Sequence, residues 1–178
     1  MNRIYAIAVF TCLALAAAMA SAAPVTAGLD KIAVYAGTWK TATEHFATPF
    51  SKAGMETAML RNHCWRSAGF YACDQFVNGE SRALIVFVYD AKHDLYHSYA
   101  IPAESGRVFA GTLIIKGNRW TYPNEYTNHG KTVYFRTVNV FNGPGSIEFR
   151  QEFSEDRAHW TLMAKGHETK IRQPHHKK

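Results

Sequence analysis

The stretch Cys64-Trp-Arg-Ser-Ala-Gly-Phe-Tyr-Ala-Cys73 contains both cysteines that lie beyond residue 22. It has the pattern of two strands joined by a tight turn at Ala68-Gly69. A two-residue loop there places Cys64 directly opposite Cys73, at a cross-strand spacing that suits a disulfide. A catalytic or redox role is the alternative, although the usual two-residue redox spacing is absent. The hairpin therefore predicts a disulfide and an oxidising compartment.

The first 22 residues have the pattern of a secretory signal peptide. Arg3 gives a positive start, residues 4–18 are almost all apolar, and Ala20-Ser21-Ala22 supplies the small residues of a cleavage site. An uncleaved membrane anchor is the alternative, but the apolar run is shorter than the roughly 20 residues that span a bilayer. The sequence therefore predicts export to the periplasm or the medium, with no membrane span.

Residues 23–170 are enough for one domain with a core of its own, and residues 171–178 are expected to form a flexible basic tail. The 178-residue chain has a net charge of +6 at pH 7. Outside the tail, basic residues alternate with acidic ones and form no basic stripe with interleaved aromatic side chains. Nucleic acid is therefore not an expected partner, and a monomer and a homodimer both remain open.

The rest of the chain follows two patterns in turn. Apolar residues recur at helical spacing between residues 29 and 35, and Gly37 ends this short helix. From Thr38 onward the apolar residues alternate with period two between turn residues. The predicted strands are residues 39–46, 56–66, 70–77, 83–89, 95–101, 107–115, 119–126, 131–141, 146–153 and 159–170.

The connections between these strands are too short for parallel crossovers, so the strands run up and down in antiparallel order. Closing such a meander into a barrel removes its two exposed edges. A barrel of about ten strands also has room inside for one small ligand. The predicted fold is therefore all-β: an antiparallel up-and-down barrel of about ten strands with one short N-terminal helix.

Two motifs resemble those of lipocalin-like proteins. The helix followed by Gly37-Thr38-Trp39 resembles the Gly-x-Trp opening of lipocalins and related calycins, in which the Trp closes the barrel floor. The hairpin, with Gln75 and the later Tyr89-Asp90, Tyr96 and Tyr99, is similar to an exported bacterial lipocalin-like family of unknown function. The resemblance covers roughly residues 29–170 and implies a calycin-like barrel without an assigned activity.

One feature departs from true lipocalins. They keep an Arg on the last strand, packed over the Trp. Here that strand offers Lys165, and the first Arg is Arg172. The resemblance therefore implies the barrel, but not the detailed lipocalin floor.

Alternation along the first strand places Thr41, Thr43 and His45 on the same face as Trp39. If the Trp points into the barrel, these small polar groups line the lumen and orient a ligand by hydrogen bonds. The outward alternative places them in solvent. We expect contacts with a small, partly apolar molecule from Trp39, Thr41, Thr43, His45, Met59, Trp65, Tyr99 and Trp120.

The register of the hairpin also places His63 opposite Asp74. A carboxylate orients an imidazole and raises its pKa, as it does beside a general base. The face that they share is expected to be buried, because it carries Met59, Trp65, Phe70 and Phe76. An isomerase or hydrolase that uses His63 and Asp74 is therefore one alternative function, and a hydrogen-bonded polar pair within the sheet is the structural interpretation.

Nine histidines prompt a metal or haem hypothesis. They fall in different turns and strands without ligand-like spacing, so no metal site and no resident cofactor is predicted. A haem barrel, the other alternative, needs one proximal His, for which His159 or His167 is the candidate. Nucleophile elbows, phosphate loops and dinucleotide fingerprints are absent. The leading prediction is a non-catalytic, exported barrel that binds a small, partly apolar molecule.

Overall fold

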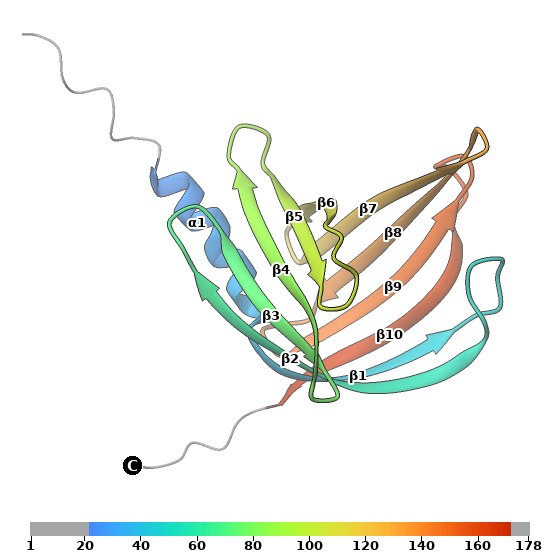
Figure 1. Cartoon of the computed structure of the whole chain (residues 1–178), viewed down its shortest axis with the longest axis horizontal. Coiled ribbons are helices and arrows are strands. Elements are labelled where there is room, and N and C mark those ends of the chain that lie inside the picture. The colour runs from blue at the N-terminus through green and yellow to red at the C-terminus, as the bar shows by residue number, and fades with distance from the viewer. Residues whose placement is uncertain (1–21, 172–178) are drawn as a thin grey trace, which may run out of the picture.

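The computed structural model describes residues 22–171, which form a closed ten-stranded antiparallel barrel with one short helix (Figure 1). The predicted fold class is confirmed. The predicted signal peptide and basic tail lie almost entirely outside the described residues. Helix α1 spans Ala22–Ile32 and continues as a 3-10 turn, Ala33–Tyr35. The strands are β1 (Gly37–His45), β2 (Gly54–Arg66), β3 (Tyr71–Val77), β4 (Glu80–Asp90), β5 (Leu95–Pro102), β6 (Phe109–Lys116), β7 (Arg119–Asn128), β8 (Lys131–Phe141), β9 (Ser146–Ser154) and β10 (Thr161–Ile171).

Each strand pairs with its neighbours in sequence, and β1 pairs with β10 to close the barrel. Helix α1 covers one end, and the β1–β2 and β7–β8 turns lie at the other (Figure 1). Within the described residues, no helix has both the length and the apolar character needed to cross a membrane.

The disulfide hairpin forms as the sequence predicts. Cys64 pairs with Cys73 across β2 and β3, and the two are joined by a disulfide. The backbone N–H of Ser67 donates to the carbonyl oxygen of Phe70 at 2.9 Å, which closes the Ala68-Gly69 turn. Both the pairing and the two-residue loop are therefore confirmed.

The core is concentrated at the helix end of the barrel. Leu29 and Ile32 of the helix are fully buried against the strands. Gly28 permits this docking, because a Cβ at that position would lie 2.2 Å from the ring of Tyr89. The hydroxyl of Tyr96 donates to the carbonyl oxygen of Gly28 at 2.6 Å. The helix is thus held by apolar burial and by one buried hydrogen bond.

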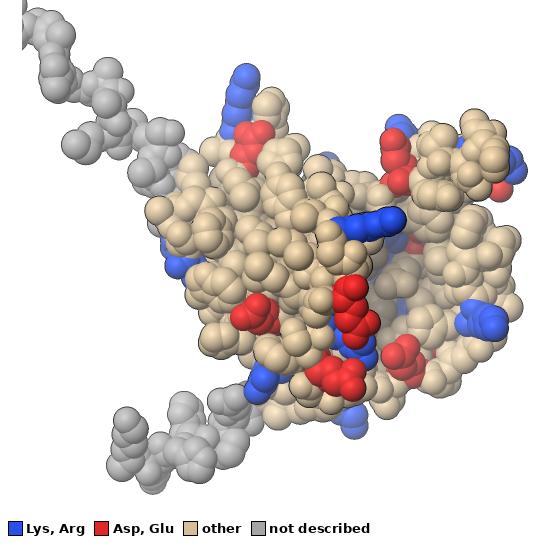
Figure 2. All heavy atoms as spheres, viewed as in Figure 1, with Lys and Arg blue, Asp and Glu red and all other residues tan. Residues whose placement is uncertain are grey.

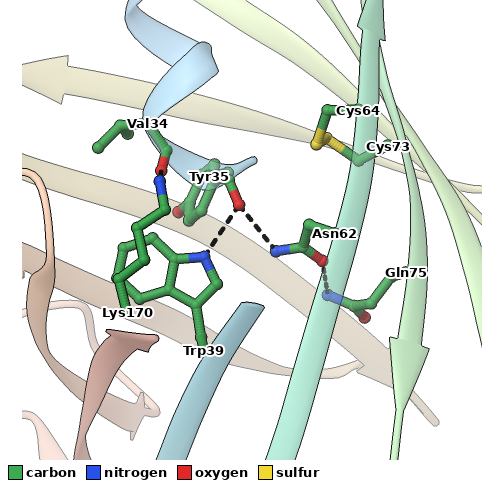
Figure 3. The surroundings of a disulfide bond; sticks show 8 residues. All are labelled: Val34, Tyr35, Trp39, Asn62, Cys64, Cys73, Gln75 and Lys170. Atoms are coloured by element: carbon green, nitrogen blue, oxygen red, sulfur yellow. Dashed lines mark hydrogen bonds between the residues drawn. A yellow bond between two sulfur atoms is a disulfide. The ribbon is translucent and has the colours of Figure 1, made fainter. Parts of the chain in front are cut away.

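Three side chains bind the carbonyl groups of the 3-10 turn (Figure 3). The indole nitrogen of Trp39 donates to the Tyr35 oxygen at 3.0 Å, and Asn62 Nδ2 donates to the same oxygen at 3.2 Å. The amine of Lys170 donates to the Val34 oxygen at 3.1 Å. These residues come from β1, β2 and β10, so the turn is bound to three strands of the barrel.

Lys170 also packs over the ring of Trp39. Its Nζ lies over the Trp39 ring, 5.0 Å from the centroid (Figure 3). Lys165, the basic residue named from the sequence, instead pairs with Glu44 at 3.2 Å on the outer face. The floor therefore keeps a cation over the Trp, supplied by Lys170.

We expect Gly37→Ala to lower the free energy of unfolding by about 1–3 kcal/mol. Gly37 has φ +118°, a conformation that L residues rarely adopt, and a Cβ there would lie 2.8 Å from Lys170 Cε. Urea denaturation gives the difference. Gly69→Ala is the matched control, because nothing lies within 4 Å of a Cβ there and its φ is not positive. Equal effects of the two substitutions would contradict this account of the floor.

Candidate ligand-binding cavity

The barrel encloses a cavity of about 620 Å³, within the roughly 300–1,000 Å³ of typical small-molecule sites. Figure 2 shows the molecule hollowed on the right side of the view, away from the helix. Much of the wall is apolar and includes Leu60, Ile85, Phe87, Phe109, Phe135 and Met163. Polar side chains line the helix end, among them Tyr35, Asn62, Gln75, Tyr122, Asn139 and Glu168, and others, such as Ser98, Thr112, Thr137 and Gln151, lie elsewhere along the wall. The cavity can therefore hold an apolar body and bind a polar group at its floor.

The cavity is lined by strands β6 and β7 where their pairing has ended. These strands share only three residue pairs, from Ile114–Thr121 to Lys116–Arg119. Beyond them, Thr112 of β6 and Pro123 of β7 both line the cavity. A proline has no N–H to donate to a neighbouring strand, so it suits the unpaired edge of β7. This part of the barrel wall therefore lacks a continuous ladder of backbone hydrogen bonds.

Two phenols and one amide form the centre of the polar floor. The hydroxyls of Tyr35 and Tyr122 lie 2.7 Å apart, and Asn139 Nδ2 donates to the Tyr35 hydroxyl at 2.9 Å. Burial raises the pKa of both phenols, so both stay protonated at neutral pH. Whichever phenol donates to the other, one phenol proton remains for an acceptor atom in the cavity.

Asn62 and Gln75 extend this network toward the disulfide. Gln75 Nε2 donates to Asn62 Oδ1 at 3.4 Å, and Asn62 in turn holds the Tyr35 carbonyl (Figure 3). Cys73 is buried and also lines the cavity. The hairpin therefore carries part of the polar floor on its inner face.

Glu168 is the acidic group of the floor. It lies on β10 between Thr41 of β1 and Ile147 of β9, and it lines the cavity. Within residues 22–171, its carboxylate makes no hydrogen bond or ion pair, and burial alone raises its pKa above the ordinary value. Its negative charge also raises the pKa of Tyr35 and Tyr122. Glu168 is therefore a partly buried carboxylate that faces the cavity without a partner.

The other two charged residues that line the cavity neutralise each other. Arg136 Nε lies 2.5 Å from Glu152 Oε2, and the Arg136 guanidinium stacks 3.8 Å from the centroid of Trp160. Arg150 approaches the second oxygen of Glu152 at 3.3 Å. Glu152 itself is buried.

The structure separates most of the predicted ligand contacts from the cavity. Of the eight, Tyr99 lines it. Trp39 and Trp120 are buried in the floor core. Thr41, Thr43 and His45 share the inward face of Trp39, as the alternation predicted. The Thr41 hydroxyl donates to the Ala58 carbonyl oxygen at 3.3 Å, and His45 Nε2 lies 3.5 Å from Glu56 Oε2. None of the three residues lines the cavity.

Met59 and Trp65 lie on the outer face of β2 and are 38% and 41% exposed. The expectation that this face is buried was wrong. The register does place His63 opposite Asp74, but on this outer face, and neither residue lines the cavity. The pair is therefore not in position to act on a molecule bound inside the barrel.

The haem candidates also lie outside the cavity. The side chain of His159 is 91% exposed and lies 2.7 Å from Asp156 in the β9–β10 connection. His167 is exposed on β10, next to the inward-facing Glu168. Within the described part of the chain, no three His, Cys, Asp or Glu residues are grouped to hold a metal ion.

The sequence reasoning missed Tyr35, Asn139 and Glu168. One signal was available for Glu168: it lies two residues before Lys170, on the face of β10 that packs over Trp39. Reading it required the register between the first and last strands, which no local pattern supplies. Tyr35 falls in the segment predicted as helix, but it lies in the 3-10 turn after the helix, and its phenol contacts Tyr122 and Asn139.

No protein-family model matches the chain, and no curated protein matches its sequence. Among solved structures, it resembles the crystal structure of Rv2717c from M. tuberculosis, with a TM-score of 0.50 and 9% identity over 82% of this chain and 98% of that one. A redesigned beta barrel matches with a TM-score of 0.33 and 12% identity over 79% of this chain and 94% of that one. The likeness to Rv2717c supports the fold alone.

We expect Glu168→Gln to raise the melting temperature at pH 7. Because burial raises the pKa of Glu168 in the folded state, the folded protein binds this proton more readily than the unfolded chain does. Stability from this group is therefore greatest at low pH and is lost as the pH rises through the folded-state pKa. The difference in melting temperature between the variant and the wild type should shrink as the pH falls from 7 toward 4. Scanning calorimetry measures this difference.

Glu148→Gln is the control for this experiment, because Glu148 is exposed on the outer side of β9. It should leave the pH profile of the melting temperature unchanged. A lower melting temperature for Glu168→Gln at pH 7 would mean that the carboxylate stabilises the fold, contrary to its lack of a partner.

Proposed function

We propose that this protein binds a small, partly apolar molecule inside its barrel and does not transform it. The observation that carries the proposal is the cavity itself, with apolar side chains along its wall, a hydrogen-bonding floor and an incomplete ladder between β6 and β7. Small-molecule sites typically combine a mainly apolar lining with a few convergent polar groups. The lipocalin-like motifs at Gly37-Thr38-Trp39 and at the disulfide hairpin favour the same function.

The polar groups of the cavity support binding rather than catalysis. The phenols of Tyr35 and Tyr122 bond each other, and Asn62 bonds Gln75. Catalysis by acyl or proton transfer commonly needs a nucleophile and a base in mutual hydrogen-bond reach. The hydrogen bonds among the lining residues join phenols, amides and the Arg136–Glu152 ion pair, and in the described chain they form no pair of nucleophile and base.

We further propose that the protein acts after export, in the periplasm or outside the cell. The N-terminal pattern of residues 1–22 and the Cys64–Cys73 disulfide both favour this compartment. A carrier or scavenger of small apolar molecules is a function that an aqueous, oxidising compartment accommodates without cofactor or energy supply.

Titration with the neutral fluorophore N-phenyl-1-naphthylamine tests the binding function. Its emission rises in an apolar environment, so we expect a saturable increase with one site per chain. Ala100→Trp should weaken this binding by at least about tenfold, since Ala100 lines the cavity and an indole would fill it. Competition by extracts from the source cell then reports the natural ligand.

Thr57→Trp is the matched control, because Thr57 is exposed on the outer face of β2. It adds the same side chain without entering the cavity, and it should leave the titration unchanged. Absence of saturable binding, or equal binding by wild type and Ala100→Trp, would overturn the proposed function.

A further inference from the structure

Building on the proposed function, we propose that the ligand is an amphipathic amine: an apolar body that carries a protonated nitrogen, which Glu168 binds at the cavity floor. The site consists of the Glu168 carboxylate, the neutral phenols of Tyr35 and Tyr122, and the apolar wall beyond them. This assigns Glu168 a direct contact with the ligand.

Glu168 has no partner for its charge among the described residues. A carboxylate removed from water normally gains a cation or several hydrogen-bond donors in return. The neighbours of Glu168 across the sheet are Thr41 and Ile147, and the Thr41 hydroxyl donates to the Ala58 carbonyl oxygen. Neither neighbour compensates the charge. The uncompensated group faces the cavity, where a ligand can reach it.

The second feature is the charge of the cavity. Its charged lining residues are Arg136, Glu152 and Glu168, and the first two form an ion pair. Arg150 also lies on the second oxygen of Glu152, so Glu152 has two cationic partners and Glu168 has none within the described residues. The nearest cation along β10, Lys170, directs its amine to the Val34 carbonyl oxygen and the Trp39 ring. Glu168 is thus the charged lining residue left for a ligand to pair.

The third feature is the surface around the carboxylate. The phenols of Tyr35 and Tyr122 remain neutral, because burial raises the pKa of each. Phe87 and Phe135 add aromatic surface to the wall. Aromatic faces attract a cation that has lost part of its hydration. An anionic ligand such as a fatty acid would meet repulsion from Glu168, and a neutral ligand would leave its charge unpaired.

Three probes with one naphthalene body separate the possible head groups: 2-naphthylmethylamine, 2-naphthalenemethanol and 2-naphthoate. Calorimetric titration of the folded protein at pH 7 should show the amine binding at least about tenfold more tightly than the alcohol, and the carboxylate most weakly. Glu168→Gln should reduce the affinity for the amine to within about threefold of the affinity for the alcohol. Glu148→Gln, on the outer side of β9, should retain the preference.

The pH dependence gives a second measurement. Protonation of Glu168 removes the ion pair, so the preference for the amine should fall as the pH decreases through the raised pKa of this group. Tyr35, Tyr122 and Lys170 are the titratable groups that lie nearest on the inner face, and all three keep their charge state over this acidic range.

Equal affinities for the amine and the alcohol, or a preference that survives Glu168→Gln, would overturn the amine proposal. Binding of the alcohol that Ala100→Trp abolishes would then still support the general binding function. If neither the amine nor the alcohol binds and N-phenyl-1-naphthylamine also fails, both proposals fall together. The two proposals are therefore distinguished by the alcohol and the neutral fluorophore.

Discussion

The carbonyl groups at the end of the N-terminal helix are the constraint on which the barrel depends. A helix end leaves backbone oxygens without partners, and a buried one must find them elsewhere. Here Trp39, Asn62 and Lys170 supply the donors to Val34 and Tyr35. Because these donors come from β1, β2 and β10, the full set of hydrogen bonds forms only when the first and last strands lie side by side. Docking of the helix and closure of the barrel therefore stabilise each other.

The same constraint creates the polar end of the cavity. Once its carbonyl oxygen is fixed, the Tyr35 side chain is held within the barrel, where its phenol meets Tyr122 and Asn139. Tyr35 therefore both closes the floor of the barrel and lines the cavity. Glu168 lies beside this network as a charge without compensation, which disfavours the folded state and gains nothing for packing. Natural proteins retain such locally unfavourable groups mainly where a site requires them.

Local pattern was sufficient for the strands and for the disulfide hairpin. Period-two alternation, short turns and the spacing of Cys64 and Cys73 determine each pairing between neighbours in sequence. The residues of the site were harder to predict from the sequence. Glu168 and Lys170 reach the floor through the pairing of β1 with β10, and Tyr122 and Asn139 come from two further strands. Side chains alternate between the two faces of β10, so the face of each lysine depends on its exact position along the strand. Lys165 lies on the outer face and Lys170, five residues later, on the inner face. Both follow a register shift between Leu162 and Ala164. Apolar character also misled, since Met59 and Trp65 remain exposed on the outer face.

The incomplete ladder between β6 and β7 connects this architecture to ligand access. A barrel with every strand fully paired would admit a ligand only through its open end. Here the pairing between β6 and β7 stops at Ile114 and Thr121. Phe109, the first residue of β6, is 56% exposed and also lines the cavity. An apolar body is therefore in contact with the wall as soon as it enters. The unpaired strand edges leave polar backbone groups along this part of the wall. Entry is thus favoured for a molecule that is apolar along its length and polar at the end that reaches Glu168.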